Sequence, residues 1–142
     1  MIYLDTSAMV KLVVREEESG HLIEWLNNDG DVRDCCTAQI GRIELMRAAL
    51  RVGANAQLAI AAARHLLDRV DTLLMAPAIA AMAETIGPAE LRTLDALHLA
   101  TILVNRSSVT AVCAYDRRLI AACEQHALTV VTPGQDRGDQ FR

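Results

Sequence analysis

Short apolar segments typical of β-strands alternate along this chain with longer segments of helical pattern. The strand-like segments are residues 2–4, 33–37, 73–75, 109–114 and 128–131. The helical segments are residues 8–14, 19–28, 40–50, 56–70, 77–87, 94–104 and 117–126. Strands separated by helices pair in parallel, because each helix returns the chain to the same end of the sheet. The pattern therefore predicts an α/β fold, a three-layer α/β/α sandwich with a central parallel sheet.

The chain has 142 residues, which is the size of one domain. Hydrophobic residues make up 52% of it and aromatic residues only 3%, so the core must be aliphatic and rich in alanine. This composition excludes a disordered tail, a collagen-like chain and a small disulfide scaffold. We expect one domain over residues 1–132 and a polar, frayed tail over residues 133–142.

The sequence also predicts where the protein resides. No apolar run approaches the roughly 20 residues needed to span a bilayer. The first residues lack the basic and apolar regions of a signal peptide. The four cysteines form no CxxC pair, so neither a zinc site nor a redox motif is indicated. We expect reduced, mostly buried thiols in a cytoplasmic protein that makes no membrane contact.

Two acidic residues directly follow predicted strands. Asp5 comes after the first strand, and Asp116 comes just after the strand that ends near residue 114. Ligands of parallel α/β sheets bind beyond the carboxyl ends of the strands, so both residues are candidates for a site. Aspartate is also a favoured N-cap, and both residues precede predicted helices. The cap and the site remain alternative interpretations of each residue.

Asp95 lies on a largely apolar predicted helix, on the same face as Leu99. Burial of a carboxylate there is costly unless a partner or a cation compensates it, which favours a functional role. The alternative is a first-turn acid that the helix dipole stabilises, with Thr93 as the N-cap. His98 shares this face, and we interpret it as a hydrogen-bonded core residue rather than a ligand.

Glu44 lies on another predicted helix, where it could simply pair with Arg47 at i,i+3. With Asp5, Asp95 and Asp116 it has a second interpretation. Several carboxylates near one point repel each other unless a cation neutralises them. Oxygen ligands without histidine or cysteine suit Mg²⁺ or Mn²⁺, and such an ion can activate water and stabilise charge on a phosphate. If the four acids converge, they suit phosphodiester cleavage.

Four short motifs contain these acids: LDTS at residues 4–7, IEL at 43–45, LDALHLA at 94–100 and YDRRL at 115–119. In order and spacing they resemble PIN-domain ribonucleases, in particular the VapC-type toxins of bacterial toxin–antitoxin pairs. The resemblance extends from residue 2 to about residue 132. It implies a PIN-like α/β/α sandwich and a Mg²⁺-dependent endoribonuclease, with Mn²⁺ as a substitute. It also implies a homodimer inhibited by a cognate antitoxin, often VapB-like.

The same resemblance implies roles for individual residues. Three aspartates would bind the metal: Asp5, Asp95 and Asp116. Glu44 would contribute partly through water, and Thr6 or Ser7 would orient Asp5 or a water. RNA would be hydrolysed by a metal-activated water, leaving a 5′-phosphate and a 3′-hydroxyl.

The chain departs from the family pattern at two places. Relatives often have serine shortly before the glutamate, where this chain has Gln39, Ile40 and Gly41. Some have a further acid where this chain has Leu119, so we expect one metal rather than two.

Five arginines lie near the motifs and could hold the RNA backbone: Arg42, Arg47, Arg92, Arg117 and Arg118. Ordinary solvated surface is the alternative for each of them. The scarcity of aromatic residues suits structured RNA that is recognised by its shape. The formal net charge of −4 argues against broad, non-specific binding of nucleic acid.

Three other functions are compatible with an aspartate after the first strand. A phosphatase of the haloacid dehalogenase type needs a second aspartate where Ser7 stands, and a downstream lysine. A receiver domain needs a similar lysine, whereas Lys11 is the only lysine of this chain. A non-catalytic PIN-like module that only binds a partner would be expected to have lost some of the four acids. That module remains the alternative to the ribonuclease.

Overall fold

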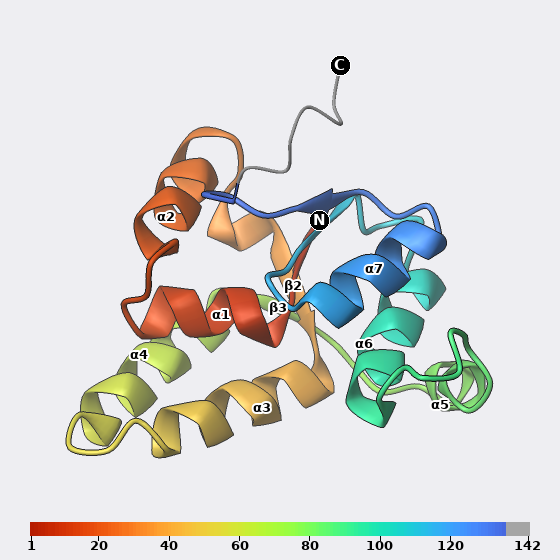
Figure 1. The fold of residues 1–142 in the computed structure, drawn as a ribbon. Helices are drawn as coiled ribbons and strands as arrows, with labels where there is room; N and C mark the ends of the chain where they lie inside the picture. Colours follow the sequence, from red (N-terminus) through yellow and green to blue (C-terminus); the bar gives the residue numbers. More distant parts are fainter. Residues whose placement is uncertain (136–142) are drawn as a thin grey trace.

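A computed structural model describes residues 1–135 of the chain, in which parallel strands form one central sheet covered by helices on both faces (Figure 1). The sheet of the described residues has five strands, in the order β3-β2-β1-β4-β5. They are β1 (Ile2–Leu4), β2 (Cys35–Ala38), β3 (Asp71–Leu73), β4 (Ala111–Cys113) and β5 (Val130–Val131). Every pairing is parallel. The predicted three-layer sandwich is confirmed.

The helices occupy the predicted places along the chain. They are α1 (Thr6–Val13), α2 (Ser19–Asn28), α3 (Gln39–Leu50), α4 (Ala56–Leu67), α5 (Pro77–Ala83), α6 (Thr93–Val104) and α7 (Arg117–Gln125), with a 3₁₀ turn η1 (Val32–Asp34). Figure 1 shows α1, α2 and α4 on one side of the sheet and α6 and α7 on the other. Within residues 1–135, no helix is long and apolar enough to cross a membrane.

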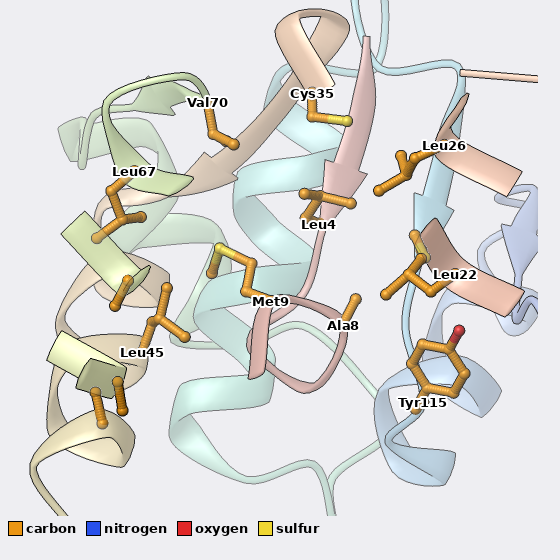
Figure 2. Packing of buried hydrophobic residues seen from close by; sticks show 14 residues of the cluster. Leu4, Ala8, Met9, Leu22, Leu26, Cys35, Leu45, Leu67, Val70 and Tyr115 are labelled. Atoms are coloured by element: carbon orange, nitrogen blue, oxygen red, sulfur yellow. The ribbon is translucent and has the colours of Figure 1, made fainter. Parts of the chain in front are cut away.

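Neighbouring strand residues face opposite layers of the core. Leu4 and Cys35 pack against α1, α2 and α4, whereas Tyr3 and Cys36 pack against α6 and α7. This alternation follows from the period of two in a pleated strand. In Figure 2, Leu4 and Cys35 lie among aliphatic side chains of the first layer, such as Met9 of α1. Both faces of the sheet are thus buried at its centre, which explains why β1 and β4 are apolar without interruption.

The four cysteines are free and buried, as predicted, and burial raises the pKa of the Cys36 thiol to about 11. Strand β3 begins and ends two residues before the predicted segment 73–75. It is an edge strand that pairs only with β2 among the described residues, so burial does not mark it in the sequence. Leu74 and Met75 follow it and are exposed. Most of the predicted tail, residues 136–142, lies outside the described residues.

The strand order places β1 in the middle of the sheet, next to β4. From β1 the chain adds β2 and β3 on one side, and β4 and β5 on the other. The carboxyl ends of β1 and β4 are adjacent, because Leu4 is in register with Cys113 and the Asp5 N–H donates to the Cys113 carbonyl at 3.0 Å. The connections that leave β1 and β4 at this edge lead to opposite sides of the sheet, toward β2 and β5. Parallel α/β sheets bind their ligands at such a point.

Candidate active site

The predicted acids Asp5, Glu44, Asp95 and Asp116 line one pocket of about 340 Å³. Asp5 directly follows β1, Asp116 precedes α7, Asp95 lies in the first turn of α6 and Glu44 lies on α3. The pocket therefore opens at the point where β1 and β4 end. A larger groove of about 500 Å³ lies between α1, α2 and α4, but none of the four acids lines it.

Asp5 is buried and caps α1. Its Oδ2 accepts hydrogen bonds from the Ser7 N–H at 3.1 Å and from the Ser7 hydroxyl at 2.6 Å. The Ser7 Oγ in turn accepts the N–H groups of Tyr115 at 2.9 Å and of Asp116 at 3.3 Å. One hydroxyl thus links the carboxylate after β1 to the loop after β4.

Asp116 caps α7 in the same manner, since its Oδ1 accepts the N–H groups of Arg118 at 2.9 Å and Leu119 at 3.1 Å. The N-cap interpretation of Asp5 and Asp116 is therefore correct, yet it does not compete with a site. Two capped helices that start at adjacent strands bring their cap carboxylates into one pocket.

Asp95 is half-buried in the first turn of α6. The N-cap of that helix is Arg92 and Thr93 is already helical, so the predicted Thr93 cap is wrong. Burial raises the pKa of Asp95, and the charges of Asp116 and Asp5 raise it further. The negative charges of Asp95, Asp116 and Asp5 thus repel one another across the pocket.

Glu44 points from α3 toward α6 and the start of α1 rather than toward Arg47. Its Oε1 accepts the Thr6 hydroxyl at 2.9 Å and lies 2.5 Å from the His98 Nε2. Burial alone would raise the pKa of Glu44, but the hydrogen bond and charge of His98, together with Thr6, hold it below its ordinary value. The carboxylate is therefore ionised at neutral pH.

His98 is among the residues that line the pocket and is 2% exposed. Its Nδ1 is 2.5 Å from the Tyr3 hydroxyl, and its Nε2 is 3.7 Å from the Asp5 Oδ1. Burial lowers the pKa of His98, but the nearby carboxylates, with Glu44 first, raise it overall. The predicted hydrogen-bonded core histidine is thus found, but its partner is one of the candidate acids. In the sequence, its place one turn after Asp95 indicates the pocket, but nothing there indicates the contact with Glu44.

The donor set of the pocket suits a hard cation. It consists of carboxylate oxygens, which Mg²⁺ and Mn²⁺ prefer. The raised pKa of Asp95 marks negative charge that a cation would balance. Within residues 1–135, no three His, Cys, Asp or Glu side chains are already grouped as metal ligands. The carboxylates that line the pocket fit the ion by their chemistry, and the ligands are not preassembled.

The five candidate arginines are placed differently. Arg92 lines the pocket, and Arg117 and Arg118 are exposed at the start of α7, beside Asp116. Arg47 is exposed and lines a neighbouring groove that Glu44 also borders.

The fifth arginine, Arg42, is directed into the fold. Its Nη1 donates to the Leu67 carbonyl and the Thr72 hydroxyl, both at 3.0 Å. These contacts hold α3 against α4 and β3.

Residues 2–125 match the family described as PIN domain. The chain belongs to the PIN-domain family. The family resemblance stated from the motifs is therefore confirmed. This PIN domain is 42% identical over 138 residues to the ribonuclease VapC47 of Mycobacterium tuberculosis, covering 96% of this chain and 100% of the relative. It is 40% identical over 141 residues to the ribonuclease VapC35 of the same organism, again covering 96% and 100%.

Solved structures show the same fold. A structure of FitAB bound to an IR36 DNA fragment superposes with a TM-score of 0.67 at 18% identity, covering 99% of this chain and 100% of that chain. The crystal structure of M. tuberculosis VapC20, described as a sarcin-ricin loop cleaving toxin, gives a TM-score of 0.67 at 19% identity, with 86% and 95% covered. These likenesses establish the PIN-like sandwich.

Proposed function

We propose that this PIN domain is a Mg²⁺-dependent endoribonuclease that also works with Mn²⁺, and that it is the toxin of a toxin–antitoxin pair. The observation that carries the proposal is the pocket lined by Asp5, Glu44, Asp95 and Asp116 where β1 and β4 end. Relatives that align over almost the whole chain are named ribonucleases, which supports the same class of reaction.

The metal would be held by the three aspartates Asp5, Asp95 and Asp116, with Glu44 contributing partly through water. When bound, the ion would lower the pKa of a water molecule and stabilise charge on the phosphate. The Ser7 hydroxyl keeps the Asp5 carboxylate in one orientation, so that its Oδ1 faces the pocket side on which His98 lies. A carboxylate that is already oriented loses less entropy when it binds its ligand.

Glu44 keeps one carboxylate oxygen available on the side of the pocket. Its contacts with Thr6 and His98 both use Oε1, and its pKa is held below the ordinary value. Oε2 can therefore take a hydrogen bond from a water or from the RNA. Arg92 lines the pocket, and Arg117 and Arg118 are exposed beside it; all three would hold phosphates of the RNA. Hydrolysis would leave a 5′-phosphate and a 3′-hydroxyl as products.

The partners follow from the same proposal. We expect a cognate, VapB-like antitoxin to inhibit the enzyme, and the enzyme to be a cytoplasmic homodimer. Helix α5 and the residues before it expose an apolar surface that includes Leu74 and Met75, and only Ile79 of the helix is buried. A second copy of the chain could cover this surface.

The proposal is tested with purified protein that has been freed of antitoxin and incubated with total RNA. Mg²⁺ or Mn²⁺ should support cleavage, and a chelator should abolish it. Asp5→Asn and Asp95→Asn should each abolish it as well. Glu24→Gln removes the charge of an exposed acid on α2 and should leave cleavage unchanged.

Correctly folded wild-type protein that cuts no RNA with either ion would refute the nuclease. The non-catalytic PIN-like module that only binds a partner would then be the better interpretation. Cleavage that persists in the chelator would refute the metal requirement alone.

A further inference from the structure

A buried histidine joins three structural elements beneath the acidic pocket. His98 of α6 meets the Tyr3 hydroxyl of β1 through Nδ1 and the Glu44 carboxylate of α3 through Nε2, each at 2.5 Å. Tyr3 is fully buried in β1 and lies two residues before Asp5, which directly follows that strand. The Tyr3 and His98 rings pack edge to face, with their centroids 6.0 Å apart.

The direction of the hydrogen bond between His98 and Glu44 follows from the acids. The His98 Nε2 faces Glu44 Oε1 and, at 3.7 Å, Asp5 Oδ1. Carboxylate oxygens only accept hydrogen bonds, so Nε2 must carry a hydrogen. The other ring nitrogen, Nδ1, lies within hydrogen-bond distance of the Tyr3 hydroxyl, so the contacts run from Tyr3 through His98 to Glu44.

Glu44 depends on these contacts for its orientation. It projects from a helix surface on a side chain with several rotatable bonds, and its side chain is 27% exposed. Within residues 1–135, the side-chain hydrogen bonds of Glu44 come from Thr6 and His98 and share Oε1. They hold one oxygen against the fold and turn the other toward the pocket that Glu44 lines.

Helix α3 approaches His98 closely because Gly41 has no side chain. A Cβ at position 41 would lie 2.6 Å from the Thr37 Oγ1 and 3.4 Å from the His98 Cε1. Gly41 is one turn before Glu44, so this close approach sets the depth at which Glu44 reaches the imidazole. Thr37 is itself fixed, because its hydroxyl donates to the Leu4 carbonyl at 2.8 Å.

We infer that His98, anchored by Tyr3, is a positioning residue of the active site that fixes the Glu44 carboxylate for RNA cleavage. This inference rests on the proposed nuclease function. His98 acts through Glu44 and does not touch the RNA. Groups that orient the ligands or acids of a metal site commonly contribute 10- to 100-fold to activity.

The test compares steady-state cleavage by three variants. His98→Leu removes both hydrogen bonds and should lower kcat about 100-fold, with KM for RNA unchanged. His98→Gln keeps an N–H that can reach Glu44 and should recover about tenfold over His98→Leu. Tyr3→Phe keeps the ring but loses the anchor, and should lower kcat about tenfold.

Leu22→Ala is the control for lost stability, because Leu22 is fully buried in the other layer of the core. It should retain kcat at a temperature where it is folded. If His98→Leu loses no more activity than Leu22→Ala, or if its loss is in KM alone, the inference is overturned. If His98→Leu fails to fold, Tyr3→Phe and His98→Gln provide the test. A wild-type kcat in both of these variants would overturn the inference.

A second measurement does not depend on activity. The proton on the His98 Nε2 should give a resolved ¹H NMR signal in the metal-free protein, identified by its loss in His98→Gln. Glu44→Gln should shift this signal, whereas Glu24→Gln, a matched change of an exposed acid, should not. If the wild-type protein is inactive but Glu44→Gln still shifts the signal, the nuclease function is refuted and the contact between His98 and Glu44 is supported. A signal that Glu44→Gln leaves unmoved would overturn the contact itself.

Discussion

The hydroxyl of Ser7 is expected to stabilise the edge of the sheet where β1 and β4 end. It donates to the Asp5 carboxylate at 2.6 Å and accepts the N–H groups of Tyr115 at 2.9 Å and Asp116 at 3.3 Å. Ser7→Ala removes all three contacts without adding volume. Its effect on folding therefore measures how firmly the loop after β4 is held against the carboxylate after β1.

The magnitude follows from the kinds of contact that are lost. A hydrogen bond to a charged group contributes about 1.5–3 kcal/mol, and a buried N–H left without a partner costs about 1–3 kcal/mol. Ser7 is half-buried, so water can replace part of both losses. We expect Ser7→Ala to lower the free energy of unfolding by about 2–3 kcal/mol. For a domain of this size that lowers Tm by roughly 4–12 °C.

Urea and thermal unfolding, followed by circular dichroism in the presence of a chelator, measure this loss without any contribution from a bound metal. Ser107→Ala removes an exposed serine hydroxyl from a turn and should change stability by less than about 0.5 kcal/mol. If Ser7→Ala is as stable as Ser107→Ala, the three contacts do not hold this edge and the reasoning is refuted.

Three further outcomes are expected. In a chelator, Asp95→Asn should stabilise the protein in urea or leave it unchanged, because burial and neighbouring acids disfavour the charge; a large loss would identify a structural cap or ion pair. Gly41→Ala should cost about 1–3 kcal/mol in the same assay, since its Cβ would lie 2.6 Å from the Thr37 hydroxyl. Hydrogen bonds, first the one from Lys11, lower the pKa of Glu18 from 4.5 to about 2. This stabilisation is present above pH 4.5 and is lost as the pH falls toward 2, so urea unfolding of Glu18→Gln should depend less on pH across that range.

The fold was predictable where burial leaves a mark on the sequence. The central strands are apolar on both faces, and α2 has the predicted bounds, residues 19–28. Edge strand β3 was misplaced, because a strand that pairs on one side is only partly buried. The sequence predicts Leu74 and Met75 as part of it, yet they are exposed beyond its end.

The candidate site was predictable as a set of residues but not as a network. Asp5 and Asp116 could be found because each follows a strand, and Asp95 because it interrupts an apolar helix. Tyr3 was not singled out, because an aromatic residue in a strand suggests nothing beyond the core. The sequence predicts His98 only as a hydrogen-bonded core residue, since a sequence does not reveal which group a buried imidazole meets.

The sequence by itself determined the local features of this protein: the alternation of strands and helices, the acids that cap α1 and α7, and the oxygen-only chemistry of the candidate site. These depend on residues close together in the chain. Only the tertiary structure decided that β1 lies beside β4, that four distant acids share one pocket, and that His98 connects Tyr3 to Glu44. Such contacts join residues 54 and 95 positions apart, so they exist only once the layers have packed against each other.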